Sequence, residues 1–111
     1  MAKKVGQLPI PPDAVGDPNS VEMIRAWIAN RGLHISLNIG VWRKQGISEE
    51  KAWGILLADV IRHVANAIQE SEGLDQEDTI RAIKRQLDVE LYEPTSPHRG
   101  RFVEPLSEDD S

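Results

Sequence analysis

The chain has 111 residues, no cysteine and a formal net charge of −5, with 40% hydrophobic and 28% charged residues. This profile is typical of one soluble globular domain, and the lack of cysteine excludes disulfides, a thiolate nucleophile and zinc–sulfur sites. Most of the net charge comes from four acidic residues near the C-terminus, Glu104, Glu108, Asp109 and Asp110. The rest is nearly neutral, which argues against binding to nucleic acid or to a membrane surface.

The first 19 residues contain four prolines together with Gly6, Gly16 and Asp17. This composition does not sustain a helix or a central strand, so it predicts an extended Pro-rich arm. No apolar segment of the kind found in signal peptides follows Met1. The sequence therefore favours a cytoplasmic protein of bacterial type.

Residues 21–42 have a period of two, which is typical of strands with one face on a core. Apolar residues occupy the even positions from 24 to 28 and the odd positions from 33 to 41. Asn30-Arg31-Gly32 separates the two runs, which predicts an antiparallel β-hairpin.

The register of this hairpin follows from its apolar faces. If both runs face the same side, paired residue numbers add up to an odd value, because a slip of one residue turns a strand over. The loop then holds an even number of residues. Either Arg31-Gly32 is a two-residue turn that pairs Ile28 with Ile35, or residues 29–32 form a four-residue loop that pairs Ile28 with Leu33. The side chains expected to face the helix of residues 49–72 are Ile24, Ala26, Ile28, Leu33, Ile35 and Leu37.

The other face of the hairpin is less polar than a solvent-exposed face usually is. It carries Met23 and Arg25 together with two indoles, Trp27 and Trp42. Such a surface is expected to be covered by a partner chain or by a terminal arm. We expect these four residues to form the interface of a homodimer or of a complex with another protein, with a monomer covered by its own arm as the alternative.

A long amphipathic helix is predicted for residues 49–72. Ser48 is a suitable N-cap, two glutamates follow it, and Gly73 can end the helix. The apolar residues within an arc of about 140° on a helical wheel are Trp53, Leu56, Leu57, Val60, Ile61, Val64, Ala67 and Ile68. This stripe predicts that Trp53 is buried against the hairpin and that Ile55 lies outside the core.

A second helix is predicted for residues 76–91, with Asp75 as its N-cap. Its charged side chains are expected to pair one turn apart, Glu77 with Arg81 and Lys84 with Asp88. The order of elements gives an α+β fold of two layers: an antiparallel β-hairpin followed by two α-helices (ββαα). The domain is expected to span residues 20–93, between the arm at 1–19 and a flexible acidic tail at 94–111, where residues 101–103 are a candidate short edge strand.

Reactive side chains offer few candidates for chemistry. Asp59 and His63 lie one helical turn apart, so the carboxylate can hold the imidazole in one tautomer, as an acid–base site requires. A structural role for His63 at the border of the apolar stripe is favoured over this one. Arg62 and His34 are further catalytic candidates. The spacing of His34, His63 and His98 does not suit a metal, and no motif predicts a cofactor.

Four short motifs stand out along the middle of the chain: Arg25-x-Trp27-Ile28, then Gly32-Leu33-His34-Ile35-Ser36-Leu37, then Ala52-Trp53-Gly54-Ile55-Leu56-Leu57-Ala58-Asp59, and Arg62-His63. In these motifs the chain resembles a family of short bacterial proteins that is known only as a domain of unknown function. The resemblance covers about residues 21–70, so the arms and the second helix lie outside it. It implies no activity and no catalytic residues.

Two functions follow from these patterns. The favoured one is a non-catalytic module that associates with itself or with another protein through its hairpin. The alternative is a small enzyme or ligand-binding domain that uses Asp59 and His63 at a subunit interface, because a chain this short has little room for a pocket of its own.

Overall fold

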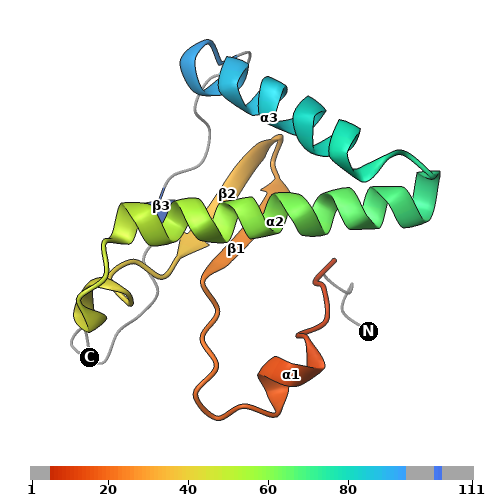
Figure 1. Cartoon of the computed structure of the whole chain (residues 1–111). Coiled ribbons are helices and arrows are strands. Elements are labelled where there is room, and N and C mark those ends of the chain that lie inside the picture. Colours follow the sequence, from red (N-terminus) through yellow and green to blue (C-terminus); the bar gives the residue numbers. More distant parts are fainter. Residues whose placement is uncertain (1–5, 95–101, 104–111) are drawn as a thin grey trace.

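The computed structural model describes residues 6–94 and 102–103. Its elements are, in order, α1 (Pro12–Val15), β1 (Ile24–Ala29), β2 (Gly32–Leu37), the 3-10 helix η1 (Arg43–Gln45), α2 (Glu49–Glu72), α3 (Gln76–Tyr92) and β3 (Phe102–Val103). A hairpin followed by two long helices confirms the predicted α+β fold (Figure 1). None of the described helices has the length and apolar character needed to cross a bilayer. The predicted tail lies outside the described residues, except for Pro94, Phe102 and Val103.

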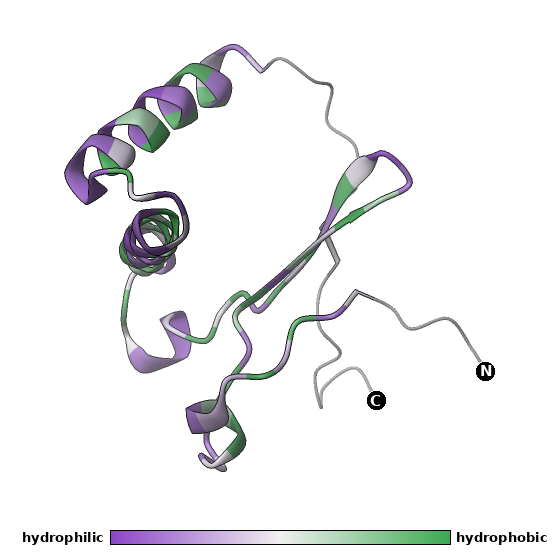
Figure 2. Cartoon of the chain, turned by 90° about the vertical axis from the view of Figure 1, so that its right-hand side faces the viewer, coloured by the Kyte–Doolittle hydropathy of each residue, from purple (hydrophilic) through white to green (hydrophobic). Residues whose placement is uncertain are grey.

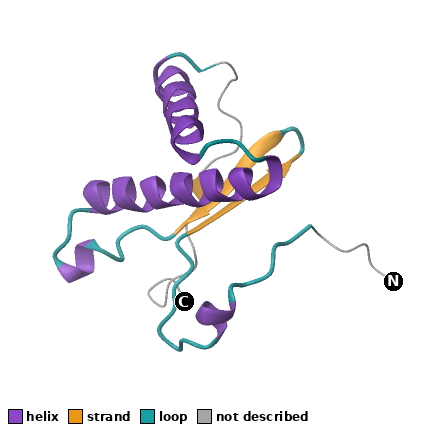
Figure 3. Cartoon of the chain, turned by 45° about the vertical axis from the view of Figure 1, so that its right-hand side comes forward, coloured by secondary structure: helices purple, strands orange, loops and turns teal. Residues whose placement is uncertain are grey.

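The arm contains one helical turn that the sequence analysis did not predict. Pro12 is the first residue of α1, where its fixed φ fits a helix and its missing N–H costs no hydrogen bond. Gly16 follows the turn, and its N–H donates to the carbonyl of Pro12 at 3.1 Å. This short helix lies apart from α2 and α3 (Figure 3).

The hairpin has the predicted parity. Ile28 pairs with Leu33 and Ala29 with Gly32, so the loop holds the two residues Asn30 and Arg31. Both loop residues have positive φ, 49° and 61°, as a two-residue type I′ hairpin turn requires. The pairing of Ile28 with Leu33 is one of the two predicted alternatives, but its loop is shorter than the four residues expected.

Strand β2 ends at Leu37, whereas the alternation of the sequence predicted a strand to residue 41. The N–H of Asn38 still donates to the carbonyl of Met23 at 3.0 Å. Two residues later Gly40 has a φ of 101°, which turns the chain away from the sheet. On the outer side of β2, the two-residue strand β3 pairs in parallel, Ile35 with Phe102 and Ser36 with Val103. The strand order is β1-β2-β3.

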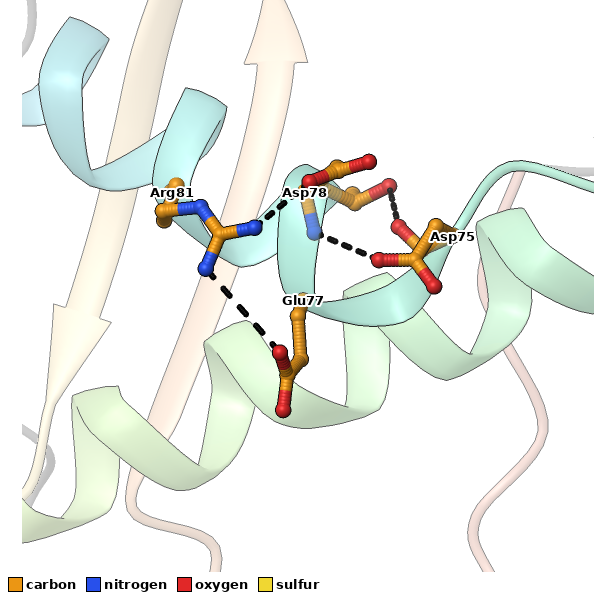
Figure 4. A network of polar contacts seen from close by, with 5 residues as sticks. Asp75, Glu77, Asp78 and Arg81 are labelled. Atoms are coloured by element: carbon orange, nitrogen blue, oxygen red, sulfur yellow. Dashed lines mark hydrogen bonds and ion pairs between the residues drawn. The ribbon is translucent and has the colours of Figure 1, made fainter.

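Both long helices begin as predicted. The Ser48 hydroxyl accepts from the N–H of Lys51 at 3.3 Å, and the Asp75 carboxylate accepts from the N–H of Asp78 at 3.0 Å. Gly73 ends α2 in the left-handed conformation, with a φ of 73°. Figure 4 shows the start of α3, where Arg81 reaches back to two acidic residues of the first turn.

The predicted ion pairs of α3 are present on its exposed surface. Arg81 lies 3.9 Å from Glu77 and 2.6 Å from Asp78, and Lys84 lies 3.1 Å from Asp88. All of these side chains are more than half exposed, so each pair contributes only a few tenths of a kcal/mol. The charges keep this face of α3 in solvent.

The helices α2 and α3 pack against each other. The least exposed residues along the middle of α2 recur at helical spacing: Ala58, Ile61, Ala65 and Ile68. The matching residues of α3 are Thr79, Ile80 and Ile83. Ala65 is 0% exposed, because a methyl side chain lets the two helices approach closely. The buried Thr79 keeps a hydrogen bond within its own helical turn, since its hydroxyl donates to the carbonyl of Asp75 at 2.8 Å.

The sheet and the helix pair do not close a common core. Among the described residues the elements in close contact are β1 with β2, β2 with β3, and α2 with α3 (Figure 2). The buried apolar side chains of that part of the chain are two alanines, Ala52 and Ala65. Ile28 on the predicted inner face of the hairpin is 83% exposed. The prediction that this face packs on α2 of the same chain, with Trp53 buried between them, is therefore wrong.

Candidate functional site

The connection between β2 and α2 is organised by one carboxylate. Glu49, the first residue of α2, accepts hydrogen bonds from the backbone N–H groups of Gly40, Trp42 and Arg43, each at 2.9 Å. A fourth hydrogen bond comes from the indole N–H of Trp53 at 3.2 Å. The carboxylate thus ties the turn after the sheet to the beginning of the helix.

These donors also set the acidity of Glu49. The backbone N–H of Gly40 lowers the pKa of Glu49 below its ordinary value of 4.5, and those of Arg43 and Trp42 and the indole of Trp53 act in the same direction. Partial burial opposes them by raising the pKa. Each carboxylate oxygen accepts two N–H groups, and this arrangement favours the ionised form, so Glu49 stabilises the loop and is not free to act as a base.

Trp42 belongs to this anchor and not to the hairpin face. Its ring meets that of Trp53 edge-to-face, with ring centroids 5.5 Å apart and an interplanar angle of 88°. Such pairs add about 0.5–1.5 kcal/mol beyond the area they bury. The predicted cluster of Trp27 with Trp42 is therefore wrong in its geometry, because η1 and the turn at Gly40 carry Trp42 to the start of α2.

Gly40 is the residue that makes the anchor possible. Its φ of 101° is rarely adopted by residues with a side chain, and it is buried. A methyl group added there would also lie 3.3 Å from the guanidinium of Arg43. No signal in the sequence identifies this role, because the acceptor Glu49 lies nine residues further on.

An apolar groove of about 540 Å³ lies beside the anchor, along one face of α2. Its walls are formed by Trp42, Ile47, Lys51, Ala52, Ile55, Leu56, Asp59, Val60 and His63. Ile55, which the helical wheel excluded from the core, is 59% exposed and lies in this groove. The groove thus brings the two predicted catalytic candidates of α2, Asp59 and His63, to one wall.

The structure does not join those two candidates as an acid–base pair. The Oδ1 atom of Asp59 forms an ion pair with Arg62, one turn along the helix, and both side chains are 61% exposed. His63 has no hydrogen bond or ion pair with the described residues. A permanently charged guanidinium attracts a carboxylate more strongly than a neutral imidazole does, which explains the choice of partner.

The remaining candidates lie elsewhere or pair differently. The Nε2 atom of His34 lies 3.0 Å from the carbonyl of Ala29 across the hairpin, away from the groove. His98 lies outside the described residues. No group of three potential metal ligands occurs in the described part of the chain.

Three of the four predicted interface residues lie on the outer face of β1 or directly before this strand. Met23, Arg25 and Trp27 are each partly exposed. Arg25 is held by Glu22 in a two-bond contact at 3.0 and 3.2 Å. Their role as an interface stays a prediction.

The sequence matches the family described as "Domain of unknown function (DUF5076)" over residues 7–95, and the chain belongs to this family. The match extends the resemblance beyond residues 21–70, so most of the Pro-rich arm and the second helix belong to the family domain, contrary to expectation. No curated protein matches the chain significantly.

A solved structure shares the fold. It comes from the photosynthetic bacterium Rhodopseudomonas palustrus CGA009 and carries a provisional description as a pyruvate dehydrogenase. The TM-score is 0.66 at 25% sequence identity, and the match covers 90% of this chain and 97% of that chain.

Proposed function

We propose that this protein is a non-catalytic, self-associating module whose core is completed by a second copy of the chain. The observation that carries this proposal is the lack of a closed core within one copy. Among the described residues two alanines are the buried apolar side chains, while apolar residues of the hairpin and of α2 are left in solvent.

The dimensions of the chain support the same conclusion. Its radius of gyration is 16.5 Å, whereas a compact chain of this length is expected to have about 13 Å. An open arrangement costs the same backbone entropy per ordered residue as a closed one, but it removes less apolar surface from water. A folded single copy would therefore have little to offset that entropy.

A second copy of the chain is the simplest candidate to bury these exposed apolar residues. In a two-fold dimer the same patch of each copy meets the other copy, so one surface satisfies both. Ile55 and Val60, two exposed apolar residues that line the groove on α2, and Leu33 of the hairpin are available for such burial. Met23, Arg25 and Trp27 offer a second surface on the hairpin.

Sedimentation of the full chain over a wide range of concentrations tests the proposal. We expect a dimer at micromolar concentration, and a melting temperature that falls on dilution, because dissociation removes the second copy from the folded state. Replacing Ile55, an exposed residue of the groove on α2, with Glu should weaken the dimer. The same change at Leu8, an exposed apolar residue of the arm, is the control and should leave the dimer intact. A chain that sediments as a monomer and melts at one temperature at every concentration would overturn the proposal.

The alternative of a small enzyme or ligand-binding domain has one observation in its favour, the placement of Asp59 and His63 in the groove. We give it second place because Asp59 is paired with Arg62 and the histidine has no described partner to orient it. A screen of small ligands for shifts in melting temperature tests the alternative directly.

A further inference from the structure

The groove on α2 contains a row of residues at intervals of four: Ile47, Lys51, Ile55, Asp59 and His63. Residues four apart lie above one another on the same face of a helix, and such rows are the ridges by which helices pack. The four members within α2 are all exposed. Helix α3 leaves this row uncovered, because it packs on the face that carries Ala58 and Ala65.

The charges of this row are arranged symmetrically about Ile55. Lys51 lies four residues before it and Asp59 four residues after it, which is about 6 Å along the helix axis in each direction. Two antiparallel copies of α2 related by a two-fold axis at Ile55 would place each Lys51 opposite Asp59 of the other copy. The same operation places Ile47 opposite His63. The row is therefore complementary to itself in charge.

Both charged groups are available for such contacts. The ammonium of Lys51 has no hydrogen bond or ion pair within the described residues. Asp59 uses only its Oδ1 atom for Arg62, so its Oδ2 atom can accept from a second cation. Exposed pairs of this kind are individually weak, but the two-fold axis produces each of them twice.

We propose that α2 packs against α2 of a second copy of this chain across a two-fold axis beside Ile55, with reciprocal contacts between Lys51 and Asp59. Ile55 is the anchor of the interface, since it is 59% exposed in one copy and lies on the axis. This assignment rests on the proposed self-association and names the surface that carries it.

A charge exchange tests the register. Lys51→Glu and Asp59→Lys each set like charges against each other twice, so each single variant should raise the Kd of the dimer roughly tenfold to a hundredfold at low salt. The double variant restores opposite charges and should return to within about threefold of the original Kd. High salt should shrink the effect of the single variants.

Two variants control for net charge alone. Lys44→Glu lies outside the groove. The two-fold axis at Ile55 places residue 61 opposite residue 49, the first residue of α2 in the other copy, so Glu70→Lys lies beyond the segment where the two helices overlap. Neither should change the Kd by more than about twofold, since exposed charges away from a contact matter little. Circular dichroism of each variant confirms that the helices are intact.

Oxidative cross-linking gives an independent measurement, because the chain has no cysteine of its own. Helix axes 8–10 Å apart place two residues on the axis within the Cα separation that a disulfide requires, roughly 4.4–6.8 Å. Ile55→Cys should therefore form a covalent dimer quickly. Leu57→Cys, on nearly the opposite side of α2, should not.

Each outcome decides the proposal. Restoration by the double variant together with linkage through position 55 supports it. A dimer that the double variant does not restore and that position 55 does not link overturns it, while the proposed self-association stands on another surface such as the hairpin. A monomeric wild type overturns both.

Discussion

The helix pair and the hairpin differ in how much of their stability one chain can supply. Between α2 and α3, Ala65 is fully buried and Thr79 is 9% exposed. On the hairpin, Ile28 is 83% exposed although it pairs correctly with Leu33. Both regions form regular hydrogen-bonded elements, so the difference lies in how far their apolar side chains are covered. The hairpin is a formed element whose apolar residues Ile28 and Leu33 remain exposed.

This difference teaches that secondary structure and core formation are decided separately. The hairpin has its turn and its register, but a two-stranded ribbon is at best marginally stable without a surface to pack on. In the helix pair, each helix provides the surface on which the other one packs. Substitutions between α2 and α3 should therefore act on the stability of one chain. Those on the hairpin or in the exposed groove of α2 should act on association.

The largest effect is expected for Ala65→Leu. This methyl group is fully buried, so a larger side chain should force α2 and α3 apart and cost about 1–3 kcal/mol of unfolding free energy. Ala82→Leu, at an exposed position of α3, is the matched control and should change stability by less than about 0.5 kcal/mol. Urea denaturation of both variants compares them. Equal losses would show that α3 does not pack on Ala65.

The next effect is expected at the anchor. Glu49→Gln replaces one carboxylate oxygen by an amide nitrogen, which cannot accept from the N–H groups that point at it. The melting temperature should fall by several degrees, and the emission of Trp42 and Trp53 should change as their contact loosens. Glu50→Gln, at the neighbouring exposed glutamate, is the control and should leave the fluorescence unchanged.

The same residue predicts a dependence on pH. Because the folded state lowers the pKa of Glu49, its stabilisation is complete above the ordinary value of 4.5 and is lost as the pH falls through the lowered pKa. Acidification from pH 7 to pH 3 should therefore reduce the melting temperature of the wild type more than that of Glu49→Gln, which has no carboxylate to protonate. Parallel losses in the two proteins would contradict this role.

The anchor also marks the limit of what the sequence predicts. Local signals were sufficient for the helix ends, because Ser48 and Asp75 act within one turn, and for the parity of the hairpin. The alternation at residues 39 and 41 predicted more strand than there is, because the turn at Gly40 depends on Glu49, an acceptor outside the pattern. Periodicity identifies an apolar face but not which chain covers it, so the packing of the hairpin was beyond prediction.

The candidate site shows the same limit. The spacing of Asp59 and His63 predicts that they lie one helical turn apart, and in the structure both residues line the groove. Spacing alone does not rank competing partners, however, and Arg62 lies as close along the helix. The groove itself depends on Trp42, which comes from the connection before α2.

A smaller effect is expected at the N-cap of α3. Asp75→Ala removes the acceptor for the N–H of Asp78 and a negative charge at the positive end of the helix dipole, so it should cost about 1 kcal/mol. Ser48→Ala should cost less, because the hydrogen bond that caps α2 is longer, at 3.3 Å, and Glu49 still anchors that end. Thermal unfolding at a fixed protein concentration ranks the two. A greater loss for Ser48→Ala would show that the anchor does not stabilise the start of α2.

The smallest effect, and a stabilising one, is expected at the tip of the hairpin. Arg31 has a φ of 61°, a conformation that costs a residue with a side chain about 1–2 kcal/mol and costs glycine nothing. Part of this gain is offset because glycine is more flexible in the unfolded chain, so Arg31→Gly should stabilise the protein by roughly 0.5–1 kcal/mol. Arg31→Ala separates the backbone from the side chain, because it removes the guanidinium but keeps the strained conformation, and it should give no gain. If Arg31→Ala stabilises as much as Arg31→Gly, then the loss of the charged side chain is responsible and the turn is not strained.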